Sequence, residues 1–487
     1  MALCALPADQ AAPAGAIAVS DSRFRKVPSS RLSRLASFGQ MAGGIAGGMV
    51  AEGARRLARG DRPHLSDLLL TPANAVRVTE QLSRLRGAAM KLGQMISLDA
   101  GDVLPAELTA ILARLRDAAH VMPPAQLNQV LVAEWGPDWR RHLAAFDATP
   151  IAAASIGQVH RAVLPDGRKL AIKVQYPGIA ASIDADVDNV ATLLRMSGLL
   201  PARLDIAPLL AEAKRQLHEE ADYQREAAQM RRYGELLAGH PAFVMPRPIE
   251  ALCGERILAM DFIPGSPIEA LEQAPPETRD AAMQALFGLV LRELFVFGHM
   301  QTDPNFANFR WQADSGRIVL LDFGAARAVP PATIEAYRAL MHAGLNEDRA
   351  ALRAALVTIG FVTPRILSRH GRAIDEMIEV LLRHLGQPGL FDFADRGFVE
   401  QIRRQAETIA ADRDAWHIPP AHTLFVQRKI SGTALLAVRM KARLPLRDMV
   451  AKAMAAGNSR DFQPQRALRE NHAMPDAPPA IDEQFDQ

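Results

Sequence analysis

The sequence has little cysteine and no long apolar run, and these two features argue against several classes of protein. Its 487 residues include only two cysteines, Cys4 and Cys253, which lie far apart and show no metal-ligand spacing. This argues against a disulfide framework or a structural zinc site and favours a reducing compartment. No stretch reaches the roughly 20 apolar residues that span a bilayer, and residues 38–51 come closest.

The sequence also lacks an excess of charge of either sign. Its 56 Lys and Arg residues balance 54 Asp and Glu residues, for a formal net charge of +2, so we expect no nucleic acid partner. The N-terminus has no cationic region and carries Asp9, which predicts neither a secretory signal nor an Arg-rich transit peptide. We therefore expect a cytoplasmic protein, with any membrane contact peripheral and on the inner face of the cytoplasmic membrane.

The length and hydrophobic content predict two packed lobes with extensions, because single cores stop growing near roughly 250 to 300 residues. Near the N-terminus, Gly39, Gly43 and Gly47 recur at four-residue spacing between basic segments. On a helix they would form a smooth strip, suited to an interfacial membrane contact or a homodimer contact. A mobile linker is the alternative interpretation.

The order of the expected elements places the motifs. Thr71 and Pro72 open a long helix that carries the sequence KLGQ, where Lys91 and Gln94 share one face. Helical sequence follows over 103–145, and a β-hairpin is predicted after Pro150. A single charged helix is expected from Asp205 to Tyr233, followed by short strands up to Ile263. The remainder is mostly helical, with one β-containing interruption at residues 300–324.

Several side chains match the parts that phosphoryl transfer requires. These parts are a cradle for phosphates, a cation, an acidic partner for that cation, and oxygen ligands for magnesium. Lys173 lies in LAIKV on the second hairpin strand, in the context of the phosphate-pairing lysine of kinases. A lone lysine on a strand is usually only solvated, so this match depends on the motifs downstream.

The downstream motifs occur in kinase order. Asp303 precedes Asn308 by the interval of the HRDxxxxN catalytic loop, although Gln301 and Thr302 replace the His and Arg. Asp322 begins a DFG triplet at the end of an apolar strand, as a magnesium-binding aspartate requires. Together these motifs predict an enzyme that binds ATP or ADP with Mg²⁺. The acidic partner of Lys173 stays open here among four carboxylates: Glu219, Glu220, Asp222 and Glu226.

A set of ordered segments resembles the UbiB/AarF family of atypical kinases, in the branch that contains the mitochondrial coenzyme Q biosynthesis ATPases. The segments are KVPSSRLSRLASFG, RGAAMKLGQMISL, AAASIGQVH, AIKVQYPG, EEADYQREA, LRELFVFGHMQTDPNFANF and LLDFGA. The resemblance implies an α+β, bilobed protein-kinase-like fold. Its parts would be a small β-rich N-lobe, a helical C-lobe and an N-terminal helical extension carrying KxGQ.

The resemblance also implies roles for individual residues. Glu226 would pair with Lys173, and both would act in catalysis with Asp303. Glu220 and Asp222 would form an ExD element that engages the KxGQ residues Lys91, Gly93 and Gln94. On one straight helix the interval from Glu220 to Glu226 turns through about 600 degrees, which puts the two carboxylates on different faces. Because KxGQ would cover the kinase peptide site, ordinary protein phosphorylation is disfavoured.

The nucleotide contacts implied by the resemblance depart from ordinary kinases. Small residues with a Cβ atom stand where kinases have glycines, and they restrict the approach of the backbone to phosphates. These residues are Ala152, Ala153, Ala154 and Ser155. The backbone near Asp261 and Ile263 would meet adenine, although many family members have Glu in place of Asp261. Asn308 and Asp322 would bind the metal.

Six segments are expected along the chain. They are a disordered leader (1–25), a basic and glycine-rich membrane or dimer segment (26–62), the KxGQ extension (63–148), the N-lobe (149–263), the C-lobe (264–464) and a disordered tail (465–487). The leading hypothesis is an atypical kinase or ATPase that supports ubiquinone biosynthesis through lipid-linked ATP hydrolysis, with a quinone-precursor lipid and ubiquinone-biosynthesis proteins as partners. The alternatives are a Ser/Thr protein kinase and a nucleotide-binding pseudokinase scaffold.

Overall fold

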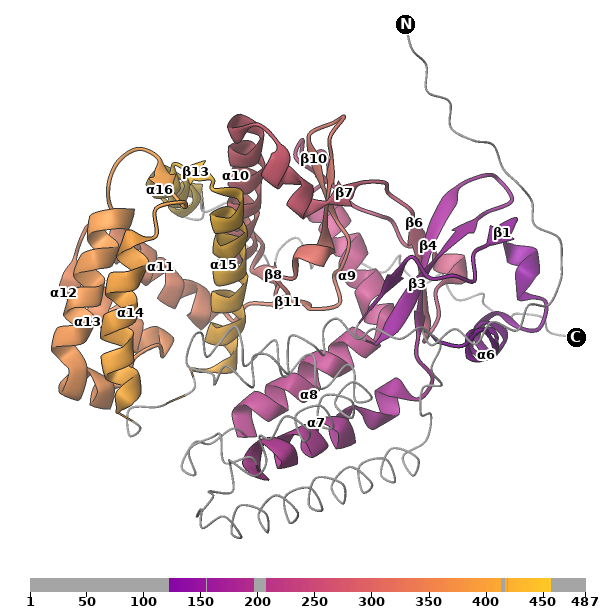
Figure 1. Ribbon diagram of the computed structural model, residues 1–487, viewed down its shortest axis with the longest axis horizontal. Helices are drawn as coiled ribbons and strands as arrows, with labels where there is room; N and C mark the ends of the chain where they lie inside the picture. The colour runs from indigo at the N-terminus through magenta and orange to yellow at the C-terminus, as the bar shows by residue number, and fades with distance from the viewer. Residues whose placement is uncertain (1–121, 155, 197–206, 413–416, 418, 457–487) are drawn as a thin grey trace, which may run out of the picture.

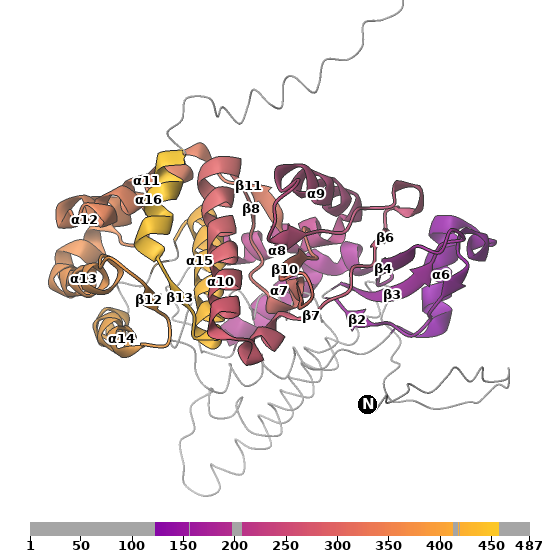
Figure 2. The same ribbon diagram turned by 90° about the horizontal axis from the view of Figure 1, so that it is seen from above.

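The computed structural model describes residues 122–154, 156–196, 207–412, 417 and 419–456. Its described part is elongated, with a β-sheet at one end and a group of helices at the other (Figures 1 and 2). The expected leader, glycine-rich segment and tail lie outside the described residues. So do Ser155 and the three KxGQ residues Lys91, Gly93 and Gln94.

The sheet at one end forms the N-lobe. Its strands are antiparallel in the order β1-β3-β4-β6, with β2 paired to β3. The central hairpin confirms the sequence prediction, and its turn uses Gly167 at φ +87°, a backbone angle that favours glycine. The elements are α6 (Pro124–Trp135), β1 (Ala145–Phe146), β2 (Ala152–Ala153), β3 (Gly157–Val163), β4 (Lys169–Gln175) and β6 (Ile257–Asp261).

Strand β4 is buried on both faces, which explains how it holds a lysine beside the core. Leu170, Ile172 and Val174 are fully buried on one face, while Lys173 points to the other face and is 9% exposed. Successive side chains alternate between the faces of a strand, so packing of the apolar set decides where Lys173 points.

The charged region of residues 207–236 forms two helices, so the prediction of one helix from Asp205 to Tyr233 was wrong. Helix α8 (Ala207–Ala221) ends and α9 (Tyr223–Leu236) begins at Asp222, whose φ of −94° and ψ of 88° leave the helical region. The Asp222 side chain accepts a hydrogen bond from the Arg225 backbone N–H at 2.9 Å, and this N-cap starts the new helix. Glu220 and Glu226 therefore lie on different helices. Helix α7 (Ile179–Met196) packs along α8.

The central part of the molecule carries the catalytic-loop motifs. Helix α10 (Pro276–Arg292) continues into a π-helical turn, η5 (Glu293–Phe297), and then into a β-ribbon that precedes Asp303. The strands are β8 (His299–Gln301) paired with β11 (Ala326–Ala328), and a sheet ordered β5 (Phe243–Val244), β10 (Arg317–Leu320), β9 (Phe309–Gln312), β7 (Ser266–Pro267). The short 3₁₀ helices are η2 (Trp139–His142), η3 (Glu250–Leu252), η4 (Ile268–Gln273) and η6 (Phe306–Asn308).

The remaining elements are mainly helical and complete the C-lobe. They are α11 (Pro331–Leu345), α12 (Arg349–Ile359), α13 (Pro364–Leu385), β12 (Phe391–Asp392), α14 (Gly397–Ala411), α15 (Ala421–Met440), β13 (Arg443–Leu444) and α16 (Leu446–Ala456). Helix α15 packs beside α10 in the middle of the molecule (Figures 1 and 2). The predicted α+β, kinase-like architecture is confirmed. Among the described helices, none combines the length and apolar character needed to cross a bilayer.

Candidate active site

Lys173 forms a buried ion pair with Glu226 at the junction of the sheet and helix α9. The Lys173 Nζ lies 2.6 Å from Glu226 Oε1, and Glu226 is 1% exposed. The same ammonium lies 3.4 Å from Asp322 Oδ2, so one cation faces two carboxylates. Of the four acidic candidates in the charged helical region, the structure brings Glu226 to Lys173.

Burial and mutual attraction set the ionisation of this cluster. Burial acts to lower the pKa of Lys173, but the carboxylates of Asp322 and Glu226 outweigh it and hold the pKa above its ordinary value. Burial raises the pKa of Glu226 from 4.5 to about 7, against the opposing effect of the Lys173 ammonium. Lys173 therefore remains a cation at neutral pH, and burial makes Glu226 easier to protonate than an exposed carboxylate.

The catalytic-loop residues lie next to this ion pair. Asn308 donates from Nδ2 to Asp303 Oδ2 at 3.3 Å, so the two motif residues are in contact. The Leu321 backbone N–H donates to the Asn308 carbonyl at 3.0 Å, which joins the loop to the residue before Asp322. The Gly324 backbone N–H donates to Asp322 Oδ1 at 2.9 Å. These bonds bring Asp303, Asn308 and Asp322 together.

The donor set fits a magnesium–nucleotide complex better than a metal held by protein alone. In the part of the chain that the structure describes, no group of three or more His, Cys, Asp or Glu side chains could hold a metal. Magnesium is usually held by one or two carboxylates, with phosphates and water completing its octahedron. Asp322 would supply a carboxylate, and Asn308 would supply its amide oxygen, because its amide nitrogen donates to Asp303. Lys173 would supply the positive charge for the phosphates.

The predicted phosphate loop lies at the edge of the sheet above Lys173. Ala152 and Ala153 are exposed, and the Ala154 N–H donates to the Gly157 carbonyl at 2.8 Å to close the turn. A Cβ atom at Gly157 would lie 2.4 Å from the Val174 carbonyl oxygen, so only glycine fits there. A glycine is thus kept at the point where the backbone of strand β4 leaves no room for a side chain on strand β3.

The predicted adenine-contacting segment follows directly after strand β6. Asp261 pairs with Leu170 at the end of the sheet, and its Oδ2 accepts from the Arg247 backbone N–H at 3.2 Å. The next backbone N–H, of Phe262, donates to Lys169 O at 2.9 Å, and Ile263 is half-buried. The chain passes from the N-lobe to the C-lobe at this point, and the contact of this segment with adenine stays a prediction.

The predicted ExD residues lie close to the DFG triplet. Asp222 caps helix α9, and a Cβ atom at Gly324 would lie 3.7 Å from the Glu220 Cα atom. Because the KxGQ residues lie outside the described residues, their contact with Glu220 and Asp222 stays a prediction.

Two arginines that the sequence analysis did not select fasten the segment after the DFG triplet. Arg225 donates to the carbonyl oxygens of Gly324, at 2.5 Å, and Ala326. Arg327 is buried and pairs with two carboxylates of helix α8, Glu212 at 2.7 Å and Glu219. The segment after Asp322 is therefore bonded to helix α8, which precedes Glu226 in the chain, and to helix α9, which contains Glu226.

The replaced His and Arg of the catalytic loop have their own partners. Thr302 is 2% exposed and donates from Oγ1 to the Ala325 carbonyl at 2.9 Å. The buried Gln301 side chain accepts from Lys429 Nζ at 3.3 Å. The loop before Asp303 is therefore held by hydrogen bonds despite the substitutions.

Comparison with known proteins agrees with this geometry. The model of the ABC1 atypical kinase-like domain matches residues 114–356. The atypical kinase COQ8B, mitochondrial, of Rattus norvegicus is 39% identical over 431 residues, which cover 88% of this chain and 81% of the relative. The atypical kinase COQ8, mitochondrial, of Saccharomyces cerevisiae is 36% identical over 423 residues, 85% of this chain and 83% of the relative. The chain belongs to the ABC1 atypical kinase-like family.

A solved structure is also similar to this ABC1-family chain. The Mycobacterium tuberculosis protein Rv3197, solved in complex with erythromycin, aligns with a TM-score of 0.53 and 26% sequence identity. The alignment covers 78% of this chain and 95% of that protein. The resemblance to UbiB/AarF kinases stated from the motifs is thus confirmed at the level of the family.

Sequence reasoning missed the supporting residues of this ABC1-family site. Tyr233, Glu293 and Lys429 lie under the catalytic loop, and Arg225 and Arg327 fasten the DFG segment. Glu293 carries a partial signal, because it lies in a largely apolar helical segment, although Arg292 precedes it directly. Lys429 directly follows Arg428 and carries no such signal. A lone buried charge needs a partner, which the sequence does not identify.

Proposed function

We propose that this protein is an atypical kinase or ATPase that binds ATP with Mg²⁺ and supports ubiquinone biosynthesis. The observation that carries the proposal is the Lys173–Glu226 ion pair at 2.6 Å, with Asp322 and the catalytic-loop residues beside it. In kinase-like enzymes this pair and the DFG aspartate must both be in place before a phosphoryl group can be transferred.

The chain's own residues divide the work of the reaction. Lys173 binds the nucleotide phosphates, and Glu226 keeps the ammonium aimed at them. Asn308 and Asp322 would hold Mg²⁺, which would neutralise the charge that develops on the transferred group. Asp303 accepts the proton of the attacking water or hydroxyl. At the same time the oxygen of that water or hydroxyl bonds to the γ-phosphorus, and the bond to ADP breaks. Most of the rate acceleration then comes from positioning and electrostatics.

The segment after the DFG triplet supports an acceptor other than a docked protein. Residues 325–330 read AARAVP, and helix α11 begins directly after them. Protein kinases have an activation loop with a phosphorylation site in this region, whereas this segment contains no Ser, Thr or Tyr. Because this short segment leaves no room for such an activation loop, we propose water or a small hydroxyl compound as the acceptor in place of a docked peptide.

The pathway part of the proposal rests on similarity. The ordered motifs resemble the coenzyme Q branch of the UbiB/AarF family, and the similar proteins include relatives named atypical kinase COQ8. We therefore propose a phenolic quinone precursor with a lipid tail as the molecule that the nucleotide cycle handles, at a membrane surface. The glycine-rich segment proposed for that contact lies outside the described residues.

The test is ATP hydrolysis by the purified full chain with Mg²⁺, with and without vesicles of anionic phospholipid and a quinone-precursor-like phenol. Asp322→Asn should reduce turnover by at least about a thousandfold, because the metal loses its carboxylate. Asp314→Asn is the matched control, since this carboxylate is exposed in the turn between strands β9 and β10. Removing Mg²⁺ with a chelator should reproduce the effect of Asp322→Asn.

Three outcomes separate the candidate functions. Hydrolysis that rises with lipid and phenol and is lost in Asp322→Asn supports the proposal. Transfer of labelled phosphate to a partner protein would instead support a protein kinase. Nucleotide binding without hydrolysis in any condition would support the pseudokinase scaffold.

A further inference from the structure

A buried carboxylate stands directly under the start of the catalytic loop. Glu293 is fully buried in the π-helical turn that follows helix α10. Its Oε1 atom accepts two hydrogen bonds, from the Tyr233 hydroxyl at 2.8 Å and from the Gln301 backbone N–H at 3.1 Å. π-Helical turns are rare and often occur at functional sites. This turn aims a charged group at the residue two positions before Asp303.

A buried lysine from far along the chain supplies the opposite charge. Lys429 of helix α15 is 3% exposed, and its Nζ lies 3.6 Å from Glu293 Oε2 and 3.3 Å from Gln301 Oε1. The ammonium also lies 5.7 Å from the centre of the Phe309 ring, which follows Asn308. One side chain of α15 therefore contacts both ends of the catalytic loop.

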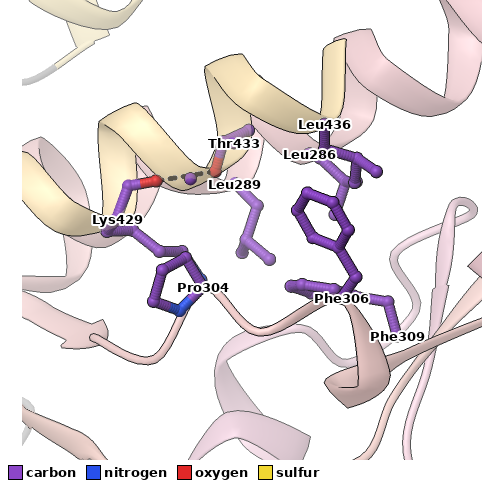
Figure 3. A pocket seen from close by; sticks show the side chains of 9 residues that line it. Leu286, Leu289, Pro304, Phe306, Phe309, Lys429, Thr433 and Leu436 are labelled. Atoms are coloured by element: carbon purple, nitrogen blue, oxygen red, sulfur yellow. Dashed lines mark hydrogen bonds between the residues drawn. The ribbon is translucent and has the colours of Figure 1, made fainter. Parts of the chain in front are cut away.

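The rest of that face of α15 continues under the loop. Figure 3 shows Lys429, Thr433 and Leu436 on α15, facing Pro304 and Phe306 of the loop. Gly432 lies against Pro304 so closely that no larger residue fits without movement. The remaining space is a cavity of about 10 Å³, about the smallest volume that can hold one water molecule. The loop thus rests on a packed surface.

The same network reaches the nucleotide side of the site. The Tyr233 ring, whose hydroxyl donates to Glu293, lies 4.9 Å from the ring of Phe323 in the DFG triplet. Tyr233 is also on helix α9, which carries Glu226. A shift of the Glu293 carboxylate would therefore displace both the loop that carries Asp303 and the metal-binding segment.

Stability alone is a poor reason for this arrangement. Removing two charges from water costs several kcal/mol for each ion, and apolar replacements of buried ion pairs are often neutral or stabilising. In some proteins such pairs instead specify one geometry, because each charge accepts few alternative positions in a medium of low dielectric. The position under a loop that lacks the usual His and Arg points to a geometric role.

We propose that Lys429 and Glu293 are positioning residues for phosphoryl transfer, holding the loop that carries Asp303 and Asn308 in its reactive geometry through Gln301. This inference rests on the proposed function of the site. It gives the C-terminal helical region a role in the reaction, since α15 supplies the charge that the catalytic loop lacks.

The variants are chosen so that loss of folding and loss of positioning can be told apart. Lys429→Met removes the charge with little change in length but leaves Glu293 buried without its cation. The double variant Lys429→Met/Glu293→Gln removes both charges, so it should recover the melting temperature that the single variant loses. Lys452→Met is the control, because this lysine is exposed on helix α16.

Two measurements are made on each variant of the full chain. At saturating ATP, turnover of the double variant should fall between about tenfold and about hundredfold, the size expected for a reactive group displaced by up to 1 Å. The dissociation constant for ADP with Mg²⁺ should change by less than about threefold, because Lys173 and Glu226 are untouched. Amide hydrogen exchange over residues 301–308 should become faster in the double variant and stay unchanged in the control.

The exchange measurement keeps this inference separate from the proposed function. If the wild type does not hydrolyse ATP, the proposed function fails, while faster exchange in residues 301–308 of the double variant would still show that the Lys429–Glu293 pair holds the loop. A well-folded double variant with wild-type exchange, or one with wild-type turnover, would overturn the inference and leave a purely structural ion pair.

Discussion

Replacing Gly432 by alanine tests how tightly helix α15 determines the position of the catalytic loop. A Cβ atom at residue 432 would lie 2.2 Å from Cβ and 2.7 Å from Cγ of Pro304. Carbon atoms in contact prefer about 3.5 to 4.0 Å, so the two elements must separate by about 1 Å or more. The Pro304 ring is closed onto its own backbone and cannot rotate away, and it follows Asp303 directly.

The expected effects on stability and on turnover differ in size. Overpacking typically costs about 1 to 3 kcal/mol of folding free energy. Replacing glycine by alanine inside a helix returns about 1 kcal/mol, so the net loss of stability is about 0 to 2 kcal/mol. A displacement of about 1 Å at a reacting group can reduce the rate by about a hundredfold. Turnover should therefore fall far more than the stability of the fold.

The assay combines Mg²⁺-dependent ATP hydrolysis with denaturant unfolding of the same preparations. Gly288→Ala is the matched control, because Gly288 lies inside helix α10 and a Cβ atom there would meet nothing within 4 Å. The control should gain about 0.5 to 1 kcal/mol and keep its turnover. Wild-type turnover in a folded Gly432→Ala protein would refute the reasoning, because it would mean that the loop tolerates displacement or that α15 yields without effect.

Four further predictions concern the ion pairs and the sheet. Burial raises the pKa of Glu226 to about 7, so wild-type turnover should decline as the pH falls below about 7, and Glu226→Gln should be slow and lack this decline. This folded-state pKa lies above the ordinary 4.5, so the contribution of Glu226 to the free energy of unfolding should decrease as the pH rises from about 4.5 to about 7. The contribution is measured as the difference in the free energy of unfolding between wild type and Glu226→Gln. Arg327→Met removes the bonds to Glu212 and Glu219, which keep contacts with Arg215 and Arg225, and should cost about 1.5 to 3 kcal/mol in denaturant unfolding. A cost under about 1 kcal/mol would contradict the role of Arg327 in holding this segment. Gly157→Ala forces a Cβ atom against the β4 carbonyl and should weaken nucleotide binding by about tenfold or more in calorimetry, and unchanged affinity would show that the phosphate loop yields.

The chemistry-bearing residues could be selected from the sequence because their spacing is local. Asp303 and Asn308 lie within one loop, and Asp322 ends an apolar strand, so both patterns can be recognised without a fold. Lys173 could be assigned to a strand because the apolar residues around it alternate. Glu226 could not be separated from its acidic neighbours by pattern alone, and its assignment came from the resemblance to a family.

Tertiary structure decided how those residues are brought together and held. The break at Asp222 depends on a side-chain cap, and its consequence, that Glu226 starts a new helix facing Lys173, exists only in the folded chain. Lys429 meets Gln301 across 128 positions of sequence. A strand or helix period records which faces are apolar, but it carries no information about which buried charge will meet which other. That choice is made when the lobes pack, because each buried charge then needs a partner in a place that water cannot reach.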